Sequence, residues 1–297
     1  MAGRPGAMAG YTSSGDALPV YANEPSDTAL RLATRLSERV GARPARVRFG
    51  FVRRLEGEGP PPLAGLLRGG RGGEVRLKLV LSLLWVAGGG DERHATGAWP
   101  ARAWAALLDL PDPEGNGQRR IHDAIRWLEE KNLIRVVRQP GKPMSLQLLL
   151  EDGSGKPYFD PAPHARKKKE SNEHVEPCEL FFQMPPSFWT DGWIVRLSGR
   201  ALTMLLVLSE VTFSGGWRWV SPSQARQKYG ISEDTWSRGV AELKRHKIID
   251  IRKKPVGEEE FDFRRVRNTY LLRFDQERRV ALPTPPAREP ANEEIEE

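Results

Sequence analysis

The segment GISEDTWSRGVAELKRHK, from Gly230 to Lys247, concentrates side chains that form hydrogen bonds and ion pairs. Apolar residues recur within it at Trp236, Val240 and Leu243, a spacing that predicts a helix with one buried face. A step of about 100° per residue then places polar side chains on the opposite face. The residues predicted on that face are Asp234, Arg238, Ala241 and Arg245, with Thr235 and Ser237 at its edges. The basic end of the segment, Lys244 to Lys247, suits the C-terminus of a helix, where cations are favoured.

Residues that carry covalent or metal chemistry are sparse. The chain has five His and one Cys, and no clustered acid and base pair or nucleophile motif occurs among them. His164, His174 and Cys178 lack the paired spacing of a zinc site. The GSGKP stretch at 153–157 is not a phosphate-binding loop, because no Ser or Thr follows Lys156. The sequence therefore predicts a protein that is not an enzyme and that uses no metal or cofactor.

The charge balance favours a polyanionic partner. The formal net charge is +7 with a pI near 9.6, and most of the positive charge comes from Arg, whose planar guanidinium suits phosphate recognition. One cysteine cannot form an internal disulfide, and no apolar run has the length of a membrane span or the layout of a signal peptide. We therefore expect a cytoplasmic protein without a membrane partner.

Composition divides the 297 residues into six parts. The two ends, 1–26 and 276–297, lack apolar periodicity and are predicted to be disordered tails, the second of them acidic. Residues 151–177 contain so few apolar side chains that an interdomain linker is expected. The other parts are an N-terminal extension at 27–73, where DTALRLATRLSERV suggests a helix, and two apolar-patterned domains at 74–150 and 178–275.

The two domains repeat one pattern. The helix pattern of the second domain recurs 115 positions earlier, at Ile121, Ile125 and Leu128. The same shift relates the apolar pairs at 133–134 and 248–249, each of which begins an alternation typical of a strand. A common spacing across a helix and the following strand indicates an internal repeat.

Each domain is predicted to contain a first helix, a short second helix, a turn, a longer third helix and a hairpin. In the second domain, Pro222 suits the first turn of the second helix and Ser232 suits the N-cap of the third. In the first domain, a longer turn, PDPEGNG, precedes a third helix at 118–131. This order, and above all the GIS..TWSRGVAEL spacing, resembles the winged helix-turn-helix family of bacterial DNA-binding regulators. The tandem arrangement is similar to that of bacterial plasmid replication initiators.

The resemblance implies that the third helix of each domain lies in the major groove of double-stranded DNA, and that the hairpin, or wing, follows the backbone. Arg238 would then bond a guanine, and Thr235 and Ser237 would bond phosphates or bases. In the first domain the outward set is Arg119, Asp123, Arg126 and Glu130, with Arg120 at its edge and wing candidates Arg135, Arg138 and Lys142. The implied DNA-binding residues are Arg119, Arg120, Arg126, Arg138, Lys142, Ser232, Asp234, Thr235, Ser237, Arg238, Arg245, Arg252, Lys253, Lys254, Arg264 and Arg265.

The expected fold class is thus α+β and mainly helical, with two winged helix-turn-helix domains in tandem. Replication initiation for a plasmid or mobile element is the expected function, with transcription regulation as the alternative and a protein-interaction adaptor as a third. Asp123 and Glu130 would repel phosphate, so the first domain is the better candidate for docking or dimerisation. A homodimer through that domain or the N-terminal extension stays open. For Trp217 and Trp219 the sequence allows two roles, packing in the core or stacking on a DNA base.

Overall fold

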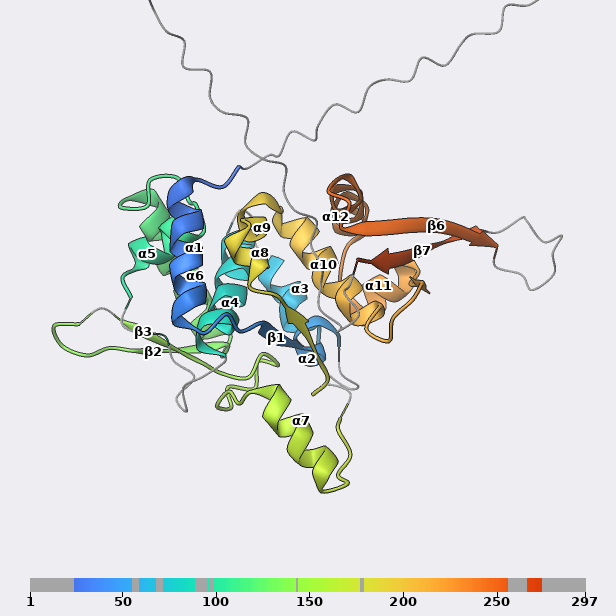
Figure 1. Cartoon of the computed structure of the whole chain (residues 1–297), viewed down its shortest axis with the longest axis horizontal. Helices are drawn as coiled ribbons and strands as arrows, with labels where there is room; N and C mark the ends of the chain where they lie inside the picture. Colours follow the sequence, from blue (N-terminus) through green and yellow to red (C-terminus); the bar gives the residue numbers. More distant parts are fainter. Residues whose placement is uncertain are drawn as a thin grey trace, which may run out of the picture.

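A computed structural model describes residues 24–54, 59–67, 72–88, 96, 99–142, 144–176, 179–255 and 266–273 (Figure 1). The fold is α+β, about half helical, with three small antiparallel sheets in the described residues. The predicted acidic tail at 276–297 and most of the tail at 1–26 lie outside this part of the chain. Residues 24–26 are ordered by polar contacts, since Ser26 donates to the Asp109 carboxylate and Glu24 pairs with Arg196 at 2.7 Å.

The first repeat consists of α4 (Gly73–Ala87), α5 (Ala101–Leu107), α6 (Asn116–Glu130) and the strands β2 (Ile134–Val137) and β3 (Ser145–Leu148). Helix α4 is apolar almost all round and lies buried, whereas α6 is amphipathic and buries the predicted Ile121, Ile125 and Leu128. The two strands pair antiparallel, with Ile134 opposite Leu148.

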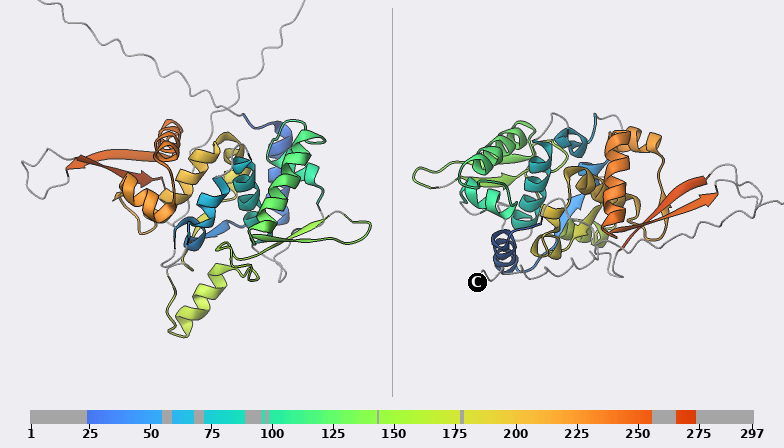
Figure 2. Two further views of the ribbon diagram at one scale, coloured as in Figure 1. Left: turned by 180° about the vertical axis from the view of Figure 1, so that it is seen from behind. Right: turned by 90° about the horizontal axis from the view of Figure 1, so that it is seen from above.

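The second repeat has the same order with one added strand. It consists of α10 (Gly199–Val211), β5 (Arg218–Trp219), α11 (Pro222–Tyr229), α12 (Glu233–Arg245), β6 (Ile249–Pro255) and β7 (Val266–Leu272). Its sheet has the order β5-β7-β6. The predicted shift of 115 positions holds between the last residues of α6 and α12 and between the first residues of β2 and β6. In Figure 1 the β2–β3 and β6–β7 hairpins lie at opposite ends of the molecule, and both views of Figure 2 agree.

The remaining elements join the two repeats. They are α1 (Asp27–Arg39), as predicted for the extension, with β1 (Ala45–Arg48), α2 (Phe49–Val52), α3 (Pro62–Leu67), β4 (Phe181–Met184), α8 (Ser187–Thr190) and α9 (Trp193–Arg196). Strand β1 pairs antiparallel with β4, so the extension shares a sheet with the segment that precedes the second repeat. The Trp85 and Trp189 rings stack at 4.6 Å, and Glu74 of α4 accepts a hydrogen bond from the first residue of α10, Gly199.

Buried apolar residues from both repeats therefore form one continuous cluster instead of two separate cores. The segment at 151–177, which the sequence predicts to be an interdomain linker, is partly helical. It contains α7 (Pro161–Glu170), which projects from the rest of the fold in Figure 1. The residues that precede α7 are held by ion pairs. Glu151 pairs with Arg48, both of them buried, and Asp160 pairs with Arg46. Charged and aromatic contacts thus order a segment that has few aliphatic side chains.

Candidate nucleic-acid interface

The turn between α11 and α12 is fixed by local backbone chemistry. Ser221 and Gln224 form a capping box at the start of α11, and Pro222 occupies its first turn as predicted. Gly230 ends α11 in the left-handed region with φ of 64°, which glycine adopts at low cost. The Ser232 side chain then caps α12 by accepting a hydrogen bond from the Thr235 backbone N–H at 3.2 Å. Ser232 therefore has a structural task in addition to any contact with a ligand.

The inner face of α12 is held against α10 by a close approach. Trp236, Val240 and Leu243 are buried as predicted, and Trp236 meets Tyr270 edge to face. Between them, Gly239 leaves no room for a side chain, because an added Cβ would lie 2.6 Å from the Arg200 carbonyl oxygen. The apolar periodicity did not predict this contact. The sequence signal that could have indicated it is a glycine inside a helical pattern.

Glu242 fixes the other end of α12. Its carboxylate accepts hydrogen bonds from the Ser198 backbone N–H at 2.8 Å and from the Ser198 hydroxyl at 2.6 Å, at the start of α10. At the end of α12, which the sequence predicts to be basic, His246 is not an exposed cation. It is buried, and its ring meets the Trp193 ring edge to face. Burial, and then the nearby Arg245, lowers the pKa of His246 below its ordinary value near 6.5. His246 is accordingly a neutral packing residue at neutral pH.

The outer face of α12 is exposed as predicted, and Asp234 forms ion pairs on it. The Arg238 Nε lies 2.7 Å from one oxygen of Asp234, and Arg200 of α10 lies 3.3 Å from the other. This pair engages one of the five N–H donors of Arg238. Asp234 therefore orients two arginines on this surface. The other predicted residues, Ser237 and Arg245, are exposed, and Thr235 is half-buried.

The corresponding face of α6 carries more acidic charge. Arg119, Arg120 and Arg126 are exposed as predicted, and Arg126 pairs with Asp123 at 3.3 Å. The long turn before α6 is ordered by Asp112, whose carboxylate accepts from the backbone N–H groups of residues 115 and 116. The helix consequently begins at residue 116, two residues before the predicted start.

The two hairpins differ in length. Seven residue pairs join β6 to β7, whereas four join β2 to β3. Arg252, Lys253 and Lys254 are exposed on β6, and Arg138 and Lys142 are exposed beyond β2. Arg264 and Arg265 lie outside the described residues. The sequence prediction missed Arg267 on β7, whose guanidinium lies 4.6 Å from the centroid of the Trp219 ring.

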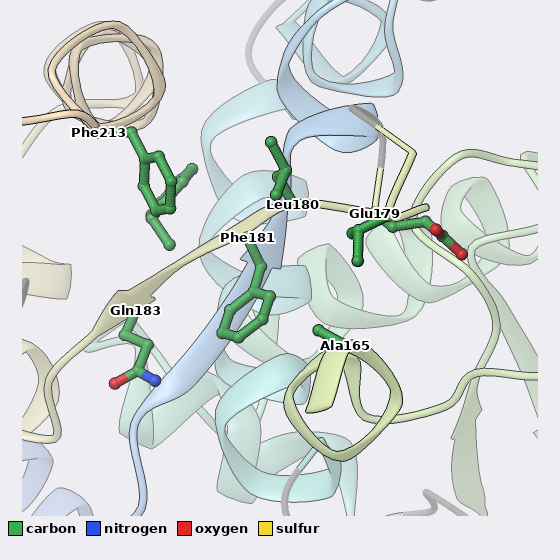
Figure 3. A pocket seen from close by; sticks show the side chains of 8 residues that line it. Ala165, Glu179, Leu180, Phe181, Gln183 and Phe213 are labelled. Atoms are coloured by element: carbon green, nitrogen blue, oxygen red, sulfur yellow. The ribbon is translucent and has the colours of Figure 1, made fainter. Parts of the chain in front are cut away.

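A separate pocket of about 260 Å³ lies between α7, β4 and the end of α10 (Figure 3). Its lining is mainly apolar, with Phe181 and Phe213 among the side chains. Glu179 lies at the edge of this pocket. Burial alone would raise the pKa of its carboxyl group, but hydrogen bonds with Lys168, at 2.6 Å, and with His164 lower that pKa, and the net shift is downward. The carboxylate is thus already paired and does not resemble a general acid or base.

Comparison of the chain with models of protein families, with curated proteins and with solved structures found no match. Across the residues that the structure describes, no group of three or more His, Cys, Asp or Glu side chains is arranged to hold a metal ion. Nor does any helix of this part combine the length and apolar character needed to cross a membrane. The exposed basic surfaces of the two repeats are the candidate interface.

Proposed function

We propose that this protein binds double-stranded DNA through two winged-helix units, 74–150 and 178–275, and that it acts without catalysis in the cytoplasm. The observation that carries the proposal is the repeated order of three helices and a hairpin, with arginines exposed on the outer face of the third helix each time. A third helix of this kind enters the major groove, and the following hairpin contacts phosphates.

Helix α12 is the better suited of the two third helices to recognise bases. Its outer face presents Arg238 and Arg245 with the small side chains of Ser237 and Ala241, so bulk does not block approach to a groove. The pair with Asp234 holds Arg238 in one direction, which lowers the entropy lost when its guanidinium bonds a guanine edge. The longer β6–β7 hairpin supplies exposed Arg252, Lys253 and Lys254 for the backbone.

The first unit makes the weaker contribution, because Asp123 and Glu130 lie among its arginines. Its contribution is tested by Arg126→Ala, which should weaken binding to a long natural site by a factor of about 5 to 10, as expected when one arginine no longer bonds a phosphate. Arg102→Ala is the matched control, since Arg102 is equally exposed on α5 but lies outside the predicted face. Equal affinities of both variants and the unchanged protein would make this unit a docking or dimerisation surface.

The two outer faces differ, so the two units should prefer different half-sites. A monomer with two unlike DNA-binding surfaces at fixed relative positions suits an asymmetric repeated site, as replication initiation for a plasmid or mobile element requires. A typical regulator is a symmetric dimer on a palindrome. Transcription regulation is therefore the second candidate, and a protein-interaction adaptor would be the third.

Sequencing and footprinting of the genomic fragments that the purified protein retains would decide between these functions. One protomer covering a non-palindromic repeat beside an AT-rich tract supports initiation, because AT-rich steps bend and open more easily. A dimer covering a palindrome at a promoter would replace initiation with regulation. No enrichment of any fragment would favour the adaptor.

A further inference from the structure

The outward face of the β5-β7-β6 sheet combines indole rings with cations. Directly paired residues point to the same side of a sheet, and Trp219, Thr269 and Arg252 are paired in turn across the three strands. Arg267 lies two residues from Thr269 and opposite Lys254, so both share this side. The opposite side faces the core with the buried Ile249, Tyr270 and Leu272. On the outward side Thr269 of the central strand is also buried and Arg267 is half-buried, whereas Trp219, Arg252 and Lys254 are exposed.

Two tryptophans on this face each have an arginine against one side of the indole ring. The Arg252 guanidinium lies 4.2 Å from the centroid of the Trp217 ring, and that of Arg267 lies 4.6 Å from the Trp219 ring. Trp219 is 43% exposed and is, with Val266, one of two large apolar residues exposed in the described chain. By contrast, the fully buried tryptophans at positions 85, 104, 189 and 193 show that this fold places indoles in its core where packing requires them. Core packing does not explain Trp219.

The chemistry of each pair suits one nucleotide. An indole offers a flat π surface for a base, and the neighbouring guanidinium offers donors for its phosphate. Trp217 and Trp219 are two positions apart, which in extended chain corresponds to about 7 Å. Bases of one strand in duplex DNA rise by about 3.4 Å and are stacked on each other, so adjacent bases of a duplex cannot occupy both rings. An unpaired strand can lengthen its base spacing and expose its base faces.

We propose that this face, formed by Trp217, Trp219, Arg252, Lys254 and Arg267, is a binding site for single-stranded DNA, separate from the outer face of α12. The site shares Arg252 and Lys254 with the hairpin surface proposed for the duplex backbone, whereas Trp217, Trp219 and Arg267 belong to this site alone. It rests on the proposed function only for the choice of DNA as the polymer. Each tryptophan stacks a base, and the cations beside it hold the backbone.

The test compares anisotropy of a labelled single strand of about 12 thymidines with that of a duplex of equal length, using the full-length protein. Trp219→Leu should weaken single-strand binding by about 5- to 150-fold, as expected when one base stack is removed, and change duplex affinity by less than about twofold. Trp219→Phe, which keeps an aromatic face, should restore most of the affinity. Trp99→Leu is the control for loss of an indole beside an arginine away from this sheet, because Trp99 lies under Arg39; since Trp99 also packs against the core, its thermal unfolding is measured in parallel.

Three results with the variants would overturn the inference. These are single-strand affinity unchanged in Trp219→Leu, equal losses on both substrates, and no recovery in Trp219→Phe when its thermal unfolding matches that of the unchanged protein. The two proposals can fail separately. Duplex binding without single-strand binding by the unchanged protein refutes this inference alone, whereas single-strand binding without duplex binding refutes the proposed function and leaves this site in place.

Discussion

In the proposed duplex complex, Arg238 and Lys253 occupy positions that would separate sequence recognition from general affinity. Arg238 lies on the outer face of α12, oriented by Asp234, whereas Lys253 lies on the hairpin strand β6. We predict that Arg238→Ala costs about 1 to 3 kcal/mol on the preferred site and little on random DNA. Lys253→Ala should weaken both by a similar factor, because a phosphate contact carries no sequence information.

Competition titrations with the selected site and with random duplex measure this difference directly. Equal losses on both sequences for Arg238→Ala would mean that α12 does not recognise bases. Ser237→Ala, on the same exposed surface, controls for general changes in the helix.

The buried His246 should make the free energy of unfolding depend on pH. Because burial and Arg245 lower its pKa in the folded protein, the unfolded chain takes up a proton there first. The stabilisation from neutral His246 is therefore complete above the unfolded pKa near 6.5 and is lost progressively as the pH falls below it. Urea midpoints measured between about pH 7.5 and pH 5 should decline, and His246→Gln should show a shallower decline. An identical slope in the variant would rule out this contribution.

At the scale of elements, the packing of α12 on α10 depends on Gly239. An added methyl group would lie 2.5 Å from the Met204 Cγ and 2.6 Å from the Arg200 carbonyl oxygen. Gly239→Ala should therefore lose about 1 to 3 kcal/mol to overpacking, offset by up to about 1 kcal/mol of helix propensity. We predict a net loss of unfolding free energy of roughly 1 to 2 kcal/mol by urea denaturation, against no more than about 0.5 kcal/mol for the exposed Ser237→Ala. A stabilised Gly239→Ala protein would contradict the tight helix contact.

The elements that the sequence predicted are those with local signals. The apolar spacing of α6 and α12 gave their buried faces, and the Ser232 cap and Pro222 marked two helix starts correctly. Strand β1 pairs with β4, which lies more than 130 positions away and is four residues long, so no local periodicity indicated the pairing. The composition of 151–177 gave no sign of α7 or of the Arg48–Glu151 ion pair, because a count of apolar residues registers neither a helix nor a buried charge pair.

In the candidate site, too, the sequence predicted what local geometry decides and missed what depends on contacts between elements. Helical geometry was enough to place Arg238 and Arg126 on exposed faces. It was not enough to pair Asp234 with Arg200, because that contact depends on how α10 crosses α12. Arg267 was missed because the strand register that puts it beside Trp219 is set by the pairing of β7 with β5 and not by its own sequence.

At the scale of the whole molecule, the two repeats behave as parts of one packed body. The Trp85–Trp189 stack joins α4 to α8, the β1–β4 sheet joins the extension to the segment before α10, and the continuous core contains buried residues of both repeats. Cutting the chain within 151–177 would therefore expose core surface, and substitutions on the surface test the contribution of each unit more cleanly. The hairpins lie at opposite ends of the molecule, so the proposed duplex interface would be extended and asymmetric (Figures 1 and 2).

The salt dependence of duplex binding tests the central claim most directly. With about six phosphate contacts spread over the two units, the logarithm of the association constant should fall with the logarithm of salt concentration at a slope near −5. Fluorescence anisotropy of the full-length protein with a duplex of the selected site, measured from about 50 to 200 mM salt, gives this slope. A slope near −5 with a preference for duplex over single strands is the result that we predict. Duplex binding that is absent, or that does not change with salt, would contradict recognition of the DNA backbone by these basic surfaces.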